Sequence, residues 1–250
     1  MNSQRKPTVV VNNGLTPSQR AVDPGQYDRQ DLSWQREGGE ARVVQYWAYL
    51  QTCVPLWDKK RVLDVGCGDG WLLSNMLRTG AQSVLGIEPS VNNRNLARAR
   101  YPKLLVVAHT WETYPMDPDS FDVIVAVLSL NHVADVPAFF RKAQVLLSAG
   151  GHIIAVVPDF DYWGQPRRRY EINVQTIDER HYAAAVTRPS GVIADIVRHQ
   201  SVYREAGENV GLTFIEDRPM PPAEAYLKLA PQYADAAGKA ITRLMRFQKA

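Results

Sequence analysis

Short apolar runs alternate with amphipathic helical segments through the middle of the chain. The runs are rich in β-branched residues, and they cover residues 61–67, 83–87, 103–107, 121–130 and 152–157. Parallel strands need a crossover connection of a dozen or more residues, which a helix supplies. The alternation therefore predicts an α/β fold, with a mostly parallel sheet covered by helices on both faces.

Local signals predict where several helices begin and end. The segment 40–57 carries apolar residues at helical spacing, and Pro55 is expected to end that helix. Ser90 is a predicted N-cap for a helix that runs to Arg100. Asp135, followed by Pro137, predicts a further helix start, and that helix is expected to end at Gly150-Gly151.

The pattern changes after Pro158. Residues 159–191 combine aromatic and charged side chains, and we expect them to form a lid insertion. The alternation then resumes, with a helix expected at 192–206, a strand at 212–217, a helix at 223–237 and a last strand at 241–247. Residues 1–40 are irregular and predict an N-terminal arm, so residues 41–250 are expected to form one domain with the lid inserted.

Composition excludes several classes of protein. A net charge of +3 with short basic runs gives no indication of nucleic-acid binding. The apolar run Val123–Leu130 is too short to span a bilayer, and the amino terminus lacks a secretory core, so we expect a cytoplasmic protein without a membrane partner. Two cysteines and five unclustered histidines predict no metal site. The expected partner is a small molecule, and the oligomeric state stays open.

The loop after the first strand holds the most chemical information. The segment VLDVGCGDG, Val62–Gly70, has three glycines at alternate positions, where the backbone is free to turn sharply and approach a ligand. Glu88 ends the second strand, where a carboxylate accepts hydrogen bonds from both hydroxyls of a ribose. Trp71 occupies the third small position of the dinucleotide fingerprint, so that fingerprint does not fit.

The spacing G-x-G-x-G after the acidic Asp64 resembles motif I of class I S-adenosylmethionine-dependent methyltransferases. The segments GIEPS, FDVIVAVLSLNHV and LLSAGG before HIIAVVP follow in that family's order. The resemblance covers about residues 40–160. It implies a Rossmann-like sheet of seven strands with the last strand antiparallel, and S-adenosylmethionine as the cofactor.

The resemblance also implies which residues contact the cofactor. The glycine loop would line the methionine part, Asp64 its amino end, Glu88 the ribose and Trp111 the adenine. Thr110 departs from the family's pattern, because many relatives carry Asp there. The expected cofactor-binding residues are Tyr27, Asp64, Gly66, Cys67, Gly68, Gly70, Trp71, Glu88, Pro89, Thr110, Trp111 and Leu128.

The cofactor's sulfonium sets the expected chemistry. Aromatic faces stabilise such a cation, and the arm and lid offer Tyr27, Trp34, Tyr162, Trp163 and Tyr170. The expected catalytic residues are His132, Asn131 and Tyr170. His132 is either the base that takes the acceptor's proton or a histidine that only hydrogen-bonds, and Asn131 either orients the substrate or caps the turn.

Two reactions fit this cofactor. The first is methyl transfer to a small molecule, by in-line displacement at the sulfonium methyl group. In the alternative, no external acceptor binds, and the aminobutyrate arm of the cofactor closes to azetidine-2-carboxylate with release of methylthioadenosine. A separate basic domain for RNA or protein substrates is missing from the pattern, so methyl transfer to a small molecule is the leading hypothesis.

Overall fold

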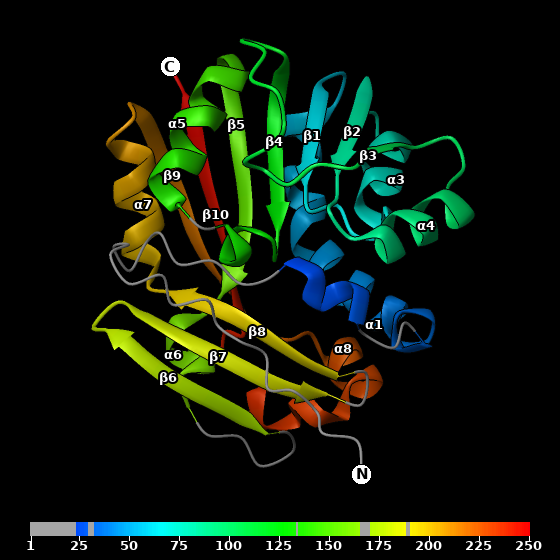
Figure 1. Cartoon of the computed structure of the whole chain (residues 1–250), viewed down its shortest axis with the longest axis vertical. Helices are drawn as coiled ribbons and strands as arrows, with labels where there is room; N and C mark the ends of the chain where they lie inside the picture. The colour runs from blue at the N-terminus through cyan, green and yellow to red at the C-terminus, as the bar shows by residue number, and fades with distance from the viewer. Residues whose placement is uncertain (1–23, 30–32, 134, 166–170, 189–190) are drawn as a thin grey trace.

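The computed structural model describes residues 24–29, 33–133, 135–165, 171–188 and 191–250, and these form two β-sheets (Figure 1). The larger sheet has the strand order β3-β2-β1-β4-β5-β10-β9. Its strands are β1 (Arg61–Val65), β2 (Ser83–Ile87), β3 (Leu105–Val107), β4 (Phe121–Val127), β5 (Leu147–Pro158), β9 (Leu212–Met220) and β10 (Thr242–Lys249). Strands β1 to β5 are parallel, whereas β10 is antiparallel to both β5 and β9. The predicted seven-stranded Rossmann-like sheet with a reversed last strand is confirmed.

Helices cover both faces of this sheet, as predicted. One face packs against α5 and α7, and the other against α1, α2 and α3. The α-helices are α1 (Ser33–Leu50), α2 (Val54–Trp57), α3 (Trp71–Arg78), α4 (Val91–Arg100), α5 (Val136–Leu146), α6 (Phe160–Trp163), α7 (Gln200–Glu208) and α8 (Glu224–Leu229). The shorter 3-10 helices are η2 (Pro24–Arg29), η3 (Gln51–Cys53), η4 (Leu130–His132) and η5 (Pro231–Ala236). In the described ranges, no helix combines the length and the apolar character that crossing a membrane requires.

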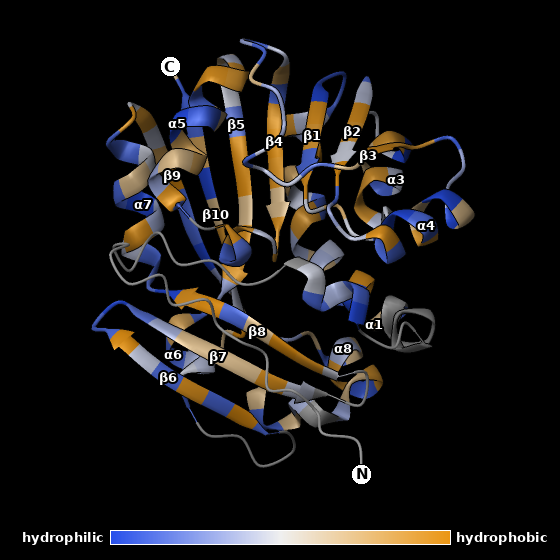
Figure 2. Cartoon of the chain, in the orientation of Figure 1, coloured by the Kyte–Doolittle hydropathy of each residue, from blue (hydrophilic) through white to orange (hydrophobic). Residues whose placement is uncertain are grey.

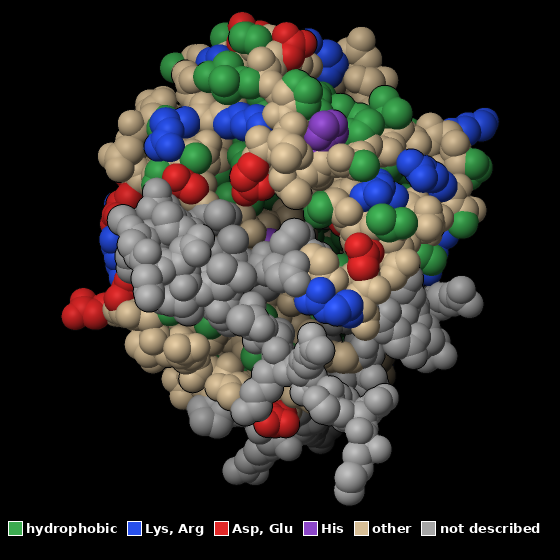
Figure 3. Space-filling model, in the orientation of Figure 1, with side chains coloured by type: hydrophobic (Ala, Val, Ile, Leu, Met, Phe, Trp, Pro, Cys, Tyr) green, Lys and Arg blue, Asp and Glu red, His purple; other side chains and the backbone are tan. Residues whose placement is uncertain are grey.

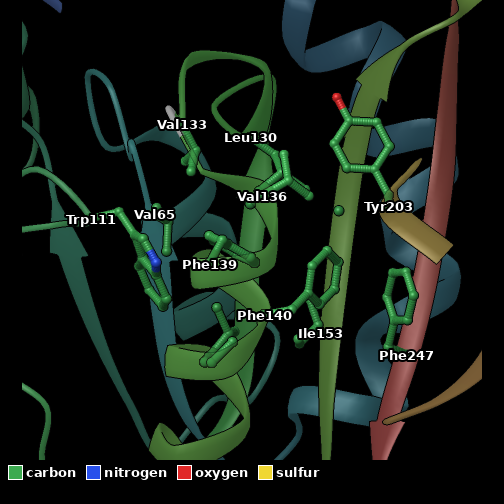
Figure 4. Packing of buried hydrophobic residues seen from close by; sticks show 14 of the residues in the cluster. Val65, Trp111, Leu130, Val133, Val136, Phe139, Phe140, Ile153, Tyr203 and Phe247 are labelled. Atoms are coloured by element: carbon green, nitrogen blue, oxygen red, sulfur yellow. The ribbon is translucent and has the colours of Figure 1, made fainter. Parts of the chain in front are cut away.

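The parallel strands are apolar on both sides because both sides are covered (Figure 2). Val62 packs toward α3, and its neighbour Leu63 packs toward α5. On the α5 face, aromatic side chains fill the space between helix and sheet (Figure 4). Phe140 stands between Phe139 and Phe247, with ring centroids 5.3 and 4.8 Å away. This core fixes the carboxyl ends of the strands, where ligands bind in such folds.

Two predicted helix caps are confirmed by hydrogen bonds. The Ser90 hydroxyl accepts from the backbone N–H of Asn93 at 3.1 Å, and α4 ends at Arg100. The Asp135 carboxylate accepts from the N–H of Ala138 at 2.8 Å. Each cap satisfies an amide that has no partner inside its helix.

Two predicted helix ends are wrong. Helix α1 already ends at Leu50, and Pro55 lies in the first turn of α2, a position that needs no N–H donor. Helix α5 ends at Leu146, and β5 runs through Gly150 instead of starting after it. Gly150 has a φ of 73°, and the pairing of β4 with β5 is irregular here, so the glycine serves a distortion of the strand.

The helix predicted at 192–206 is also wrong in its first half. Residues Gly191–Arg198 form strand β8, and only α7 is helical. Neighbouring residues Ile193 and Ala194 are both buried, as are Ile196 and Val197. A strand buried on both sides lacks the alternation of apolar and polar residues that marks an exposed strand, and its apolar spacing then imitates that of a helix.

Strand β8 belongs to the smaller sheet, with β6 (Ile172–Asp178) and β7 (His181–Arg188). This antiparallel sheet lies across the carboxyl ends of the main strands, with β8 closest to them (Figure 1). Tyr162 and Trp163, two aromatic residues considered as caps for a sulfonium, pack in the apolar cluster that joins this sheet to α8 and η5. The Trp163 indole donates to the carbonyl of Ile241 at 2.8 Å.

Candidate functional site

The glycine loop begins where β1 ends. The amides of Gly66 and Cys67 donate to the carbonyl of Ile87, at 2.8 and 3.1 Å, which ties the loop to β2. Gly66, Gly68 and Gly70 all have positive φ, a backbone conformation that favours glycine. The backbone at these three positions therefore has the sharp turns that the sequence predicted, and these turns favour glycine.

The glycines differ in what surrounds them. A Cβ on Gly66 would stand 2.6 Å from the Cβ of Ser129, so this position is closed by packing. A Cβ on Gly70 would lie 3.1 Å from Leu104. A Cβ on Gly68 would meet no described atom within 4 Å. Gly68 is thus the place where the loop presents its bare backbone to open space.

Glu88 is locked in place by the backbone around it. Its Oε2 accepts from the N–H of Gly68, and its Oε1 accepts from the N–H of Ser90, both at 2.8 Å. The carboxylate is buried, and burial raises its pKa. The Asn93 side chain also hydrogen-bonds to this carboxylate. Since each carboxylate oxygen has two acceptor positions, one position stays available for a ribose hydroxyl.

Asp64 lies beneath the loop and is also buried. Burial, followed by the neighbouring Glu88 carboxylate, raises the pKa of Asp64 to about 8. A carboxyl group with this pKa carries a proton at neutral pH, and an arriving ammonium group would favour its ionised form. Asp64 is therefore suited to the amino end of a ligand, the role that the resemblance implies.

Asp69 is a residue of this loop that sequence reasoning missed. It is fully buried, and its carboxylate accepts from Arg42 of α1 at 2.9 Å and from Arg100 of α4. The Arg42 guanidinium also lies 6.0 Å from the centroid of the Trp71 ring. Because its two partners lie on distant helices, no local motif marks Asp69. It joins α1 and α4 to the loop.

The other expected cofactor residues line the neighbouring turns. Cys67 is buried, and burial raises its thiol pKa well above the usual value, so it is a packed thiol. The Pro89 carbonyl accepts from Arg94 at 2.6 Å. Leu128, directly after β4, has a φ of 54° and donates its N–H to Val156 at 2.8 Å.

The turn after β3 holds Thr110 and Trp111. The Thr110 hydroxyl accepts from the N–H of Thr113 at 3.3 Å, so it stabilises its own turn. Trp111 is buried against Phe139, with ring centroids 4.4 Å apart, and Lys142 donates to its carbonyl at 2.7 Å. The ring thus belongs to the α5 core (Figure 4), and its buried Nε1 has no hydrogen-bond partner among the described residues.

The three candidate catalytic residues have different outcomes. His132 and Asn131 lie together in η4, after β4, and Asn131 Nδ2 is 3.3 Å from His132 Nε2. Burial lowers the pKa of His132, so the ring is neutral and able to accept a proton at neutral pH. Tyr170 lies outside the described residues, as do Arg167 to Arg169.

Tyr27, from the N-terminal arm, contacts His132. Its hydroxyl lies 2.7 Å from His132 Nε2. The neighbouring Asp28 carboxylate accepts from the Ser90 hydroxyl at 2.6 Å, which fixes η2 to the start of α4. Tyr27 therefore contacts the candidate base, His132, in this structure. Through Tyr27 and Asp28, η2 connects His132 to the start of α4.

Asp195 of β8 was missed because its segment was interpreted as a helix. Its Oδ1 accepts from Asn131 Nδ2 at 2.7 Å and lies 3.3 Å from His132 Nε2. A strand assignment for 191–198 would have placed this carboxylate beside η4.

The surface is hollowed near the centre of the face seen in Figure 3, between the main sheet above and the smaller sheet below.

Ser129 connects the glycine loop to the His132 cluster, which consists of Tyr27, Asn131, His132 and Asp195. Its hydroxyl donates to the carbonyl of Val65, and its Cβ packs on Gly66. The loop after β1 and the turn after β4 are thus in direct contact, with His132 one helical turn beyond Ser129. A ligand lying along Gly68, Glu88 and Asp64 would have the candidate base near one end.

A comparison with protein families identifies the segment that builds this arrangement. Residues 33–207 match the model of a methyltransferase domain, and this segment includes the glycine loop, Glu88, Asn131, His132 and Asp195. The chain belongs to this family. Membership confirms the predicted cofactor, S-adenosylmethionine, and the predicted class, an S-adenosylmethionine-dependent transferase.

Curated relatives of this methyltransferase match over a shorter stretch. A ubiquinone biosynthesis O-methyltransferase from Rhodopseudomonas palustris (strain BisB18) is 35% identical over 97 residues, which are 38% of this chain and 38% of the relative. A protein of the same name from Yersinia pestis (strain Pestoides F) is 37% identical over 99 residues, 38% of this chain and 41% of the relative. The match thus spans about two fifths of these relatives.

Solved structures share the fold over nearly the whole methyltransferase. A putative S-adenosylmethionine-dependent methyltransferase from Listeria monocytogenes superposes with a TM-score of 0.68 and 21% identity, over 86% of this chain and 100% of that one. An S-adenosylmethionine-dependent methyltransferase from Mesorhizobium loti gives 0.66 and 21%, over 84% and 100%. These structures thus share the fold over most of the chain.

Proposed function

We propose that this methyltransferase transfers a methyl group from S-adenosylmethionine to a hydroxyl group of a small molecule. The observation that carries the proposal is the contact between Ser129 and Gly66, which sets the His132 cluster beside the cofactor loop. The O-methyltransferase names of the curated relatives support an oxygen acceptor. Most of the rate would come from aligning acceptor and cofactor.

The cofactor half of the site has a defined task for each group. Gly68 leaves room for the methionine part, Asp64 binds its amino end and Glu88 accepts from a ribose hydroxyl. Thr110 and Trp111 border the adenine, and Leu128 meets the methionine part from β4. When bound, S-adenosylmethionine supplies a methyl group on a positively charged sulfur, from which a nucleophile displaces it in line.

The acceptor half has to remove a proton from the acceptor. A neutral hydroxyl is a weak nucleophile, and a positioned base that takes its proton accelerates the transfer by about 10²–10⁴-fold. The neutral His132 ring supplies that base, at Nε2. The acceptor oxygen forms the bond to the methyl carbon, and the electron pair of the broken carbon–sulfur bond stays on sulfur.

The test is a product analysis. Purified protein is incubated with S-adenosylmethionine, alone and with each of catechol, 4-hydroxybenzoate, aniline and thiophenol, and the products are quantified by mass spectrometry. We expect S-adenosylhomocysteine and a methylated product with a hydroxyl acceptor, and neither without one. Methylthioadenosine formed without an acceptor would contradict methyl transfer and indicate ring closure of the aminobutyrate arm.

Variants test the base. His132→Gln is expected to lower the rate of hydroxyl methylation by about 10²-fold or more, with little change in the binding of S-adenosylhomocysteine. His152→Gln is the matched control, because His152 pairs with Val123 and Gln248 in the first half of β5, away from the carboxyl ends of the parallel strands. Equal rates for the two variants would exclude His132 as the base.

A further inference from the structure

The His132 ring is held by two elements that lie far from it in the sequence. Tyr27 of η2 places its hydroxyl 2.7 Å from Nε2, and Asp195 of β8 places Oδ1 3.3 Å from the same nitrogen. The Tyr27 ring stands edge-on to the imidazole, with ring centroids 5.4 Å apart. The Tyr27 hydroxyl and the Asp195 carboxylate therefore both approach the same ring nitrogen of His132, Nε2.

Asp195 is fixed in this position from η4. Asn131 is buried and donates Nδ2 to Asp195 Oδ1 at 2.7 Å. Arg198, also buried, donates to the carbonyl of Val133 at 2.9 Å, which ties the end of η4 to β8. Two hydrogen bonds thus join η4 to β8 on either side of His132. They restrain the position of the residue that would act as the base.

Three ionisable side chains act on His132 in the described part of the chain, and a fourth acts on those neighbours. Asp195 and Arg198 come from β8, Tyr27 comes from η2, and Tyr203 of α7 lies beyond Arg198. Burial lowers the pKa of His132, Arg198 lowers it further, and the Asp195 carboxylate raises it. Of the two charged neighbours, Asp195 is thus the one that stabilises the protonated ring.

We propose that Tyr27, His132 and Asp195 act as one proton-accepting unit, in which Tyr27 relays the acceptor's proton and Asp195 is a positioning residue. The inference rests on the proposed function, methylation of a hydroxyl group. The acceptor's proton moves to the Tyr27 oxygen while the proton of Tyr27 moves to His132 Nε2. The imidazolium that forms lies beside the Asp195 carboxylate, and Tyr27 stays neutral.

The relay explains why the arm docks where it does. When the neutral ring carries its proton on Nδ1, a hydroxyl 2.7 Å from Nε2 donates to the ring, and after the transfer it accepts from the protonated ring. Gln26, next to Tyr27, accepts from the N–H of Ala194 at 2.9 Å and donates to its carbonyl at 3.1 Å. Gln26 and Ala194, the residues before Tyr27 and Asp195, are thus hydrogen-bonded to each other. These bonds restrain the distance between Tyr27 and Asp195.

The first test needs no turnover. The imidazole of His132 is titrated by NMR in the whole protein, in the wild type and in the variants Asp195→Asn, Tyr27→Phe and Asp178→Asn. Asp178 is the matched control, because it lies 2.8 Å from His181 Nδ1 in the same small sheet. We expect Asp195→Asn to lower the pKa of His132 by about one unit, because the ring loses its counter-ion. Asp178→Asn should leave it unchanged.

Tyr27→Phe should change the pKa of His132 less than Asp195→Asn does. The Tyr27 hydroxyl hydrogen-bonds to both the neutral and the protonated ring, so its loss weakens both forms. This variant changes no residue of β8, so its kcat, measured in the second test, keeps the proposal falsifiable if Asp195→Asn does not fold. A pKa of His132 that is unmoved by Asp195→Asn would overturn the proposal.

The second test uses the hydroxyl acceptor that the product analysis selects from catechol and 4-hydroxybenzoate. We expect Asp195→Asn and Tyr27→Phe each to lower kcat by about 10-fold or more with KM changed less than twofold, and the acid limb of the Asp195→Asn pH profile to move to lower pH. Wild-type kcat in both variants would overturn the relay. If neither compound is methylated, the proposed function fails, while the titration still decides whether Asp195 and His132 are coupled.

Discussion

At the scale of single residues, a substitution at Gly68 is expected to affect ligand binding and stability for different reasons. Its φ of 58° penalises any side chain, and the space before it is open. We expect Gly68→Ala to weaken the binding of S-adenosylhomocysteine by at least about 10-fold, because a Cβ would occupy the cofactor's place, and to cost about 1 kcal/mol of stability. Calorimetric titration gives the Kd, and thermal unfolding gives the stability.

Gly211 provides the control for this substitution. It also has a positive φ, 82°, and a Cβ added there would meet no described atom within 4 Å, but it lies in the turn before β9. Gly211→Ala should show the same loss of stability and an unchanged Kd. If both variants bind S-adenosylhomocysteine equally well, Gly68 does not face the cofactor.

At the scale of elements, the Gln26 side chain covers the free edge of β8. It pairs with both backbone groups of Ala194, as a neighbouring strand would. We expect Gln26→Ala to speed hydrogen exchange at the Ala194 amide by about 10-fold or more and to lower kcat for hydroxyl methylation, because Tyr27 loses its anchor. Hydrogen exchange with mass spectrometry or NMR measures the first effect.

Gln175→Ala is the matched substitution on β6, the opposite edge of the same sheet. It should leave the exchange at Ala194 and kcat unchanged. Wild-type exchange at Ala194 in Gln26→Ala would show that η2 does not hold β8.

The elements also show what the sequence was able to predict. Ser90 and Asp135 cap helices through bonds to residues three positions away, so a local pattern carries their role. Asp69 and Asp195 act on partners that the fold brings from elsewhere in the chain. The glycine loop was predictable because it depends on backbone turns within a few residues, whereas the proposed acceptor half is assembled from η2, η4 and β8.

At the scale of the whole molecule, Asp64 links stability to pH. Its pKa, raised by burial to about 8 from the ordinary 3.8, means that the folded chain holds the proton more tightly than the unfolded chain. The stability from this group is complete below pH 3.8 and is lost as pH rises through about 8. We expect Asp64→Asn to flatten the decline of the unfolding free energy between pH 5 and pH 8, measured by urea unfolding without cofactor.

Asp122 supplies the control with the opposite sign. The hydrogen bond from Arg61 lowers the pKa of its carboxyl, so its stabilisation is lost only in acid, below the ordinary aspartate pKa of 3.8. Asp122→Asn should lower stability evenly between pH 5 and pH 8 and leave the slope unchanged. A wild-type slope in Asp64→Asn would mean that Asp64 is ionised in the folded protein.

The small sheet enters the chain between β5 and α7, and the cofactor loop takes no residue from it. Substitutions in β6–β8 therefore leave every partner of Glu88 and Asp69 in place, and we expect them to change only the surroundings of the proposed acceptor. Whichever molecule receives the methyl group, the proposed donor side of the site is built from other elements of the chain.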